Sequence, residues 1–109
     1  MTGFEFFLYG LLKAAVTGAV AGAVIALICL HWQRIVDWFQ SRIALKTSDV
    51  NNVGFSLQER LANGDYRTVY GIFNTRTQQL VDTETVTSQG IDPDLQRVHQ
   101  GHPLVVYPT

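Results

Sequence analysis

The first third of the chain is a long apolar run. Between Ala14 and Gln33 no residue is charged. With the flanking leucines the run reaches about 20 residues, enough for a helix to cross roughly 30 Å of hydrocarbon. Aromatic residues lie at both ends of the run, as they do at the headgroup levels of membrane spans. The pattern predicts a single transmembrane helix, with residues 1–33 as the anchor.

The residues that flank this run bear on its processing and orientation. A cleaved signal peptide needs a positive segment before a short apolar core, but no Lys or Arg precedes Lys13 and the core is too long. This favours a retained anchor over a cleaved leader. Arg34, Arg42 and Lys46 follow the run. The positive-inside rule therefore predicts a single-pass membrane protein whose C-terminal domain is cytoplasmic.

Small residues recur every four positions along the predicted membrane helix. They are Gly10, Ala14, Gly18, Gly22 and Ala26. A spacing of four places them on one helix face, and small side chains let two helices approach closely in lipid. We therefore predict a helix-packing interface, formed with a second copy or with another membrane protein subunit. The alternative is that small residues are simply common in membrane helices.

The next segment is amphipathic. Its apolar residues fall at helical spacing, at Trp32, Ile35, Val36, Phe39 and Ile43. This period predicts a juxtamembrane amphipathic helix over residues 34–46. Aromatic rings favour the boundary between lipid and water. We therefore expect Trp32, Trp38 and Phe39 to act as membrane-interface anchors.

The remaining residues, 47–109, alternate between apolar and polar side chains as a small sheet does. A polar linker follows Thr47, and alternating runs then lie on either side of Asn63–Gly64, a dipeptide typical of β-hairpins. A short helix over residues 55–62 is the alternative, because Ser56 and Glu59 fit a capping box.

Three more elements complete this part of the chain. Residues 66–74 are rich in β-branched and aromatic side chains, and residues 79–88 predict a second, half-exposed strand. Asp92 and Pro93 predict a helix start, and the helix runs to about Gln100. The last strand, 103–107, is nearly all apolar, which favours a place between two neighbours. The predicted fold class is α+β: a transmembrane helix with a helical extension, then a small β-β-β-α-β cytoplasmic domain over residues 47–109.

Composition narrows the function classes. The 109 residues carry 8 basic and 9 acidic side chains, a net charge of −1, which excludes a globally basic nucleic-acid binder. Cys29 is the only cysteine, so neither an internal disulfide nor a cysteine-based zinc site can form. The sequence contains no phosphate loop and no Gly-x-Ser-x-Gly motif. No catalytic residue, cofactor or metal is therefore predicted.

Two groups of acidic or histidine side chains are candidates for chemistry. A metal site could use His99 and His102 with the nearby Asp92 and Asp94, but Gly101 and a helix end separate the histidines. His99 suits a helix C-terminus, where its charged form is favoured. A second group, Asp82 and Glu84, shares one strand face, and a solvated face explains it better than acid–base catalysis does.

A third group mixes basic and aromatic residues on the predicted sheet. Its members are Arg60, Arg67, Arg76, Tyr66, Tyr70 and Phe73. Such a surface can hold a nucleotide or a single strand. The region has more acidic than basic residues, however, so we expect the aromatic rings to fill the core and expect no nucleic-acid partner.

The predicted function is a non-enzymatic, membrane-anchored structural or interaction subunit. It would assemble through the Gly/Ala helix face and present its small domain to partner proteins. Its expected partners are membrane lipid and either itself or another membrane protein subunit. The alternative is a small oligomeric membrane effector, holin-like or toxin-like, that perturbs the bilayer. A pore needs a polar helix stripe, and only Lys13 and Thr17 would supply one.

Overall fold

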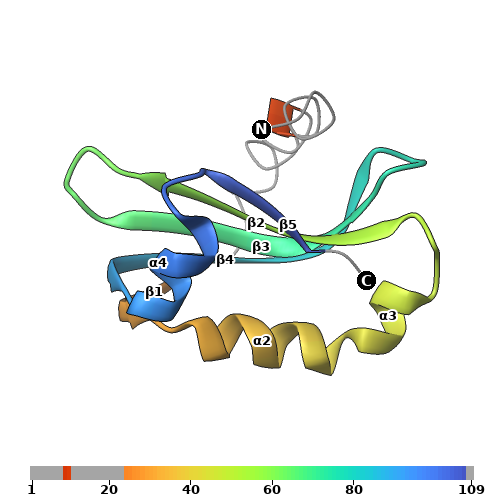
Figure 1. Cartoon of the computed structure of the whole chain (residues 1–109), viewed down its shortest axis with the longest axis horizontal. Coiled ribbons are helices and arrows are strands. Elements are labelled where there is room, and N and C mark those ends of the chain that lie inside the picture. The colour runs from red at the N-terminus through yellow and green to blue at the C-terminus, as the bar shows by residue number, and fades with distance from the viewer. Residues whose placement is uncertain (1–8, 11–23, 108–109) are drawn as a thin grey trace.

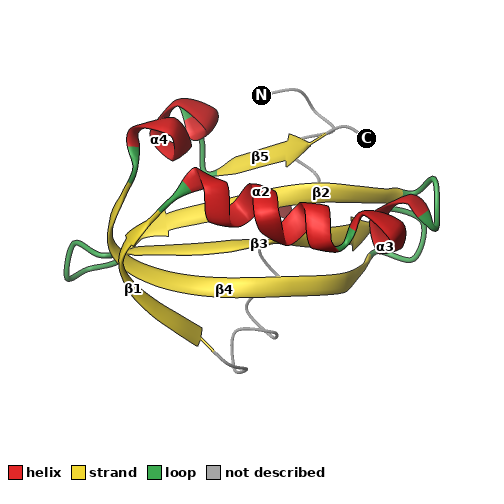
Figure 2. Cartoon of the chain, turned by 90° about the horizontal axis from the view of Figure 1, so that it is seen from below, coloured by secondary structure: helices red, strands yellow, loops and turns green. Residues whose placement is uncertain are grey.

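The computed structural model describes residues 9–10 and 24–107. Its elements are, in chain order, β1 (Val24–Leu30), α2 (Trp32–Ser41), α3 (Ile43–Thr47), β2 (Asn52–Arg60), β3 (Tyr66–Asn74), β4 (Gln79–Ile91), α4 (Pro93–His99) and β5 (Leu104–Tyr107). The strands form one sheet in the order β1-β4-β3-β2-β5. Helices α2 and α3 lie across one face of this sheet (Figures 1 and 2).

The middle of the sheet is an antiparallel meander of β2, β3 and β4. The turn between β2 and β3 holds Gly64 at φ 91°, and the Leu61 amide donates to the Asp65 carbonyl at 2.7 Å. Glycine adopts this φ without a steric penalty. The hairpin predicted at Asn63–Gly64 is therefore confirmed, and the alternative helix over residues 55–62 is wrong.

Residues 24–30, which were predicted to belong to a membrane helix, form the strand β1 instead. This strand pairs in parallel with β4, so that Val24 lies opposite Thr85 and Leu30 opposite Ile91. Among the described residues no helix is long and apolar enough to cross a membrane. The predicted fold class, with its transmembrane helix, and the predicted single-pass membrane location are therefore wrong. An apolar, β-branched run of this length suits a strand as well as part of a span, and periodicity alone does not separate the two.

Each face of the sheet carries its own core, because side chains alternate along a strand. The face under α2 buries Leu30, Ile35, Trp38, Tyr70, Ile72, Val86 and Leu95. The opposite face buries Phe55, Val69, Phe73 and Leu104, and Tyr9 packs against them. The helical prediction for residues 34–46 thus corresponds to α2 and α3, whose apolar side rests on the sheet.

Polar contacts hold the helices in place. Arg34 of α2 pairs with Glu84 of β4, and Arg42, the residue that follows α2, pairs with Asp82 of the same strand. The carboxylate of Asp92 accepts from the Leu95 amide at 2.9 Å, which caps α4, and from the Trp32 amide at 3.2 Å at the start of α2. One side chain therefore stabilises the N-terminal ends of two helices.

The last strand was expected between two neighbours, but β5 is an edge strand that pairs only with β2 among the described elements. Its apolar character has a different cause. Leu104 enters the core on one face, and Tyr107 packs beside α2 on the other. An edge strand can be apolar on both faces when each face is covered, so the apolar run does not identify a central strand.

Candidate functional site

An apolar groove runs between α2 and β5. Its volume is about 350 Å³, and it is lined by Trp32, Val36, Phe39, Gln40, Ile43, Lys46 and Tyr107. The Tyr107 ring lies 5.7 Å from the Trp32 ring and 5.6 Å from the Phe39 ring, measured between centroids. Ile43 remains 57% exposed at one end. The groove therefore offers a contiguous apolar surface with aromatic walls, a composition typical of binding sites.

The open edge of β5 adjoins this groove. Pro103 accepts from the Gln58 amide, so residues 103, 105 and 107 face β2 in the antiparallel ladder. The alternate residues, Leu104 and Val106, then direct their backbone N–H and C=O groups away from β2. No described residue pairs with these groups. They form a short template on which another strand could add.

A buried chain of hydrogen bonds lies behind Tyr107. The Nδ1 atom of His99 lies 2.8 Å from the His102 carbonyl, which can only accept, so Nδ1 carries the proton. The Nε2 atom of the neutral ring then accepts from the Ser56 hydroxyl at 2.6 Å. Ser56 Oγ in turn accepts from the Tyr107 hydroxyl at 2.7 Å. This chain joins β5, β2 and α4 through named atoms.

Burial determines how these groups titrate. It lowers the pKa of His99, with the nearby His102 adding to the effect and the bond to the His102 carbonyl opposing it. Burial raises the pKa of Tyr107 to about 12, and the hydrogen bond between Tyr107 and Ser56 opposes this shift. Both side chains are therefore neutral near pH 7, as the directions of the hydrogen bonds require.

A serine bonded to a histidine is the pairing that nucleophilic hydrolases use. Here Ser56 is fully buried and His99 is 3% exposed. Both ring nitrogens of His99 are already bonded, so the ring has no free site for a substrate proton. A nucleophile must reach its substrate, so this arrangement supports the packing of three elements rather than acyl transfer.

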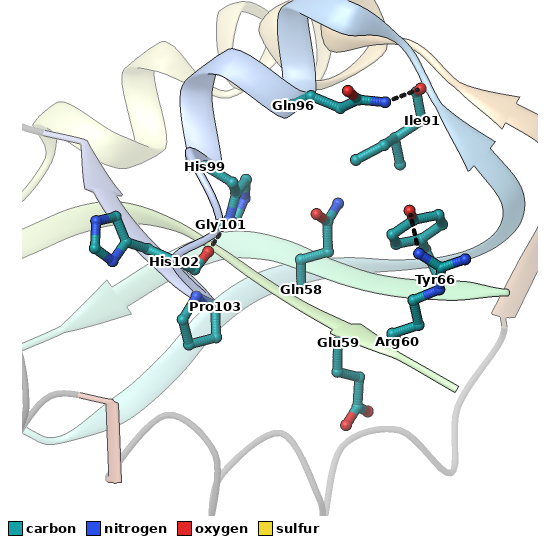
Figure 3. Close-up of a pocket in the computed structure, with 10 residues that line it drawn as sticks. All are labelled: Gln58, Glu59, Arg60, Tyr66, Ile91, Gln96, His99, Gly101, His102 and Pro103. Atoms are coloured by element: carbon teal, nitrogen blue, oxygen red, sulfur yellow. Dashed lines mark hydrogen bonds between the residues drawn. The ribbon is translucent and has the colours of Figure 1, made fainter. Parts of the chain in front are cut away.

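A second, polar cavity of about 450 Å³ lies at the end of the β2–β3 hairpin, beside α4 (Figure 3). Its lining residues are Gln58, Glu59, Arg60, Tyr66, Ile91, Gln96, His99, Gly101, His102 and Pro103. The guanidinium of Arg60 lies over the Tyr66 ring, 4.9 Å from its centroid, and donates to the Tyr66 hydroxyl at 3.0 Å. The buried His99 therefore touches the polar cavity, while Tyr107, at the other end of the hydrogen-bond chain, touches the apolar groove.

The residues of the predicted helix-packing interface are only partly placed. Ala14, Gly18 and Gly22 lie outside the described residues. Gly10 is exposed, and Ala26 lies in β1, where it pairs with Thr87. The predicted packing interface among these residues stays a prediction.

The three aromatic residues predicted as membrane-interface anchors lie on α2. Trp38 is buried against Tyr70, with the ring centroids 5.6 Å apart. Trp32 and Phe39 are half-buried and line the apolar groove with Tyr107. All three rings therefore have protein neighbours.

The fold gives the acidic and aromatic candidates for chemistry partners within the protein. Asp82 and Glu84 share a face, as expected, but they bind Arg42 and Arg34, and Glu84 also accepts from the Tyr70 hydroxyl. Among the described residues no group of three metal-binding side chains comes together. Phe73 and Tyr70 fill the two cores, on opposite faces.

Sequence reasoning did not identify the hydrogen bonds that join His99 to Ser56 and Ser56 to Tyr107. Ser56 carried only a possible capping signal, and Tyr107 belonged to an apolar strand. Their contact spans 51 residues of sequence, and nothing local indicates it. The chain matches no protein-family model, no curated protein and no solved structure.

Proposed function

We propose that this protein is a non-enzymatic interaction module that binds an extended segment of a partner protein as an additional strand on β5. The observation that carries the proposal is the outer edge of β5 beside the apolar groove, which pairs with no strand in the part of the chain that the structure describes. It keeps the interaction role predicted from the sequence and omits the membrane anchor, which no described helix supplies.

Two features support this mode of binding. The outward N–H and C=O groups of Leu104 and Val106 can form main-chain hydrogen bonds with an added strand. Every second side chain of that strand would point to the α2 side, toward Trp32, Val36 and Phe39. The partner segment is therefore extended, has apolar side chains at alternating positions and carries no charge at those positions.

The test is selection of peptides from a displayed random library against the full chain, followed by affinity measurement. We expect enriched peptides with alternating apolar residues. Val106→Pro removes the outward N–H and leaves the hydrogen bonds to β2 intact, because residue 106 faces away from β2. This change should weaken binding by several-fold to about tenfold, the effect of one lost hydrogen bond.

A second pair of variants tests the groove. Val36→Glu places a charge on the groove wall and should weaken binding by more than about tenfold. Val50→Glu is the matched control, because Val50 is 91% exposed outside the groove. The proposal is overturned if no peptide is enriched, or if the selected peptides bind Val106→Pro and Val36→Glu as tightly as the unchanged protein.

A further inference from the structure

Arg60 differs from every other arginine of the described residues. Arg34, Arg42, Arg67, Arg76 and Arg97 each lie within ion-pair distance of a carboxylate. No carboxylate of the described residues lies within ion-pair distance of Arg60. Its sequence neighbour Glu59 is bound to Arg67 instead and points away from the other cavity residues in Figure 3. A positive charge thus lies at the wall of the polar cavity, and no acidic side chain of residues 9–10 or 24–107 pairs with it.

The position of this charge is defined by contacts. The guanidinium stacks on the face of the Tyr66 ring and donates one hydrogen bond to the Tyr66 hydroxyl. This bond uses one of its five N–H donors. The remaining donors lie in a planar fork, the geometry that binds the oxygens of phosphate and carboxylate groups in pairs. Arg60 is therefore oriented as an anion receptor at one side of the cavity.

The rest of the cavity suits the uncharged part of a ligand that carries hydrogen-bond donors. Gln58 projects into the space from β2, and Gln96 lies across it on α4 (Figure 3). The amide nitrogen of Gln58 donates to Thr68, and that of Gln96 donates to the Ile91 carbonyl. Neither side-chain carbonyl has a partner among the described residues, so each can accept from a ligand. Ile91 and Pro103 add apolar contact.

We propose that this cavity binds a small organic anion, whose phosphate or carboxylate group is held by Arg60 and whose N–H or O–H donors reach the carbonyls of Gln58 and Gln96. The cavity volume of about 450 Å³ lies in the range of small-molecule sites. The site is separate from the apolar groove, so the proposal does not rest on peptide binding.

The experiment is calorimetric titration of the full chain with three probes that share an adenosine-like nucleoside. AMP carries a phosphate, adenosine-5′-carboxylic acid carries a carboxylate, and adenosine carries neither. We expect at least one anion to bind about tenfold more tightly than adenosine, the ratio that one charge-assisted contact supplies. The tighter of the two identifies the preferred anion. Equal affinity for all three probes, or no binding of either anion at millimolar concentration, overturns the proposal.

A pair of arginine variants assigns the effect to the cavity. Arg60→Gln should abolish the preference for the anion over adenosine. Arg76→Gln removes the same charge in the β3–β4 turn, at the other end of β3, and should keep the preference. Thermal melts followed by circular dichroism should establish that both variants are folded. A preference that survives in Arg60→Gln contradicts the assignment, and so does one that is lost equally in both variants.

Discussion

At the scale of single residues, His99 shows how a local prediction can place a side chain without describing its environment. The sequence placed it in the last turn of a helix, and it lies there, in α4. A helix C-terminus alone favours the charged ring. Ser56, from a strand distant in sequence, bonds to the ring and is itself bonded to Tyr107 of a second strand, and the His99 side chain is buried. The neutral form is favoured because of these long-range contacts, which no local pattern contains.

The buried ring makes stability depend on pH. Burial lowers the pKa of His99 below its usual 6.5, so the unfolded chain takes up a proton more readily than the folded chain does. The free energy of unfolding should therefore fall as the pH drops below 6.5. The Asn51 amide and Asn74 lower the pKa of Asp49 below 3.8. Protonation of Asp49 therefore lowers the free energy of unfolding only in a more acidic range.

Denaturant midpoints measured from neutral to mildly acidic pH check this expectation. His99→Gln should flatten the fall between neutral pH and about pH 5, because glutamine does not titrate. His102→Gln is the control, since this ring is exposed and only its backbone enters the hydrogen-bond chain. If both variants keep the full pH dependence of the unchanged protein, the buried His99 is not its source.

At the scale of elements, β3 and β4 depend on one close approach. Their register shifts between Ile72 and Phe73, and the backbone of β4 comes near Gly71 there. A Cβ atom at Gly71 would lie 2.3 Å from the Asp82 carbonyl oxygen. Gly71→Ala should therefore lower the free energy of unfolding by about 1–3 kcal/mol, the usual effect of overpacking.

Gly90→Ala is the matched control for this prediction. Gly90 lies in β4 too, but a Cβ atom there would meet nothing within 4 Å. We expect this variant to be neutral or slightly stabilising, because alanine reduces the freedom of the unfolded chain. Urea unfolding measures the free energy of unfolding of both variants. Equal effects of the two substitutions would mean that β3 and β4 do not approach each other at Gly71.

The elements that sequence reasoning located well are those with local signals. Asn63–Gly64 marks the hairpin, and Asp92 with Pro93 marks the start of α4. The two edge strands were not located well. An apolar run does not show which structure it forms, so β1, in which Val24 and Ile28 are 45% and 77% exposed, was assigned to a membrane helix, and β5 was assigned to the sheet centre.

At the scale of the whole molecule, both candidate sites arise from segments that meet only in the folded chain. The groove joins Trp32 and Phe39 of α2 to Tyr107 of β5. Sequence reasoning assigned the two α2 rings to a lipid interface, because it had no information on the strand that faces them. The polar cavity likewise joins the β2–β3 hairpin to α4. These surfaces depend on the sheet order, which the hydrophobic pattern does not encode.

The placement of β1 is therefore the feature of the whole molecule that most needs a direct test, and Cys29 supplies one. It is the only cysteine and lies opposite Gly90 in the parallel pair of β1 and β4. Neighbouring strands lie about 4.8 Å apart, within the range of Cα separations that a disulfide spans. Gly90→Cys should consequently form an internal disulfide with Cys29 under mild oxidation, seen as a lower intact mass and the loss of both free thiols without dimer formation.

The control is Val81→Cys, which also adds a cysteine to β4 but at a position that pairs with no residue of β1. It should keep both thiols free under the same conditions. Urea unfolding should further show that the disulfide of Gly90→Cys raises the free energy of unfolding by about 2–4 kcal/mol, since it closes a loop of many residues in the unfolded chain. If Gly90→Cys crosslinks no faster than Val81→Cys, then β1 does not pair with β4, and the apolar run of residues 24–30 must be placed elsewhere.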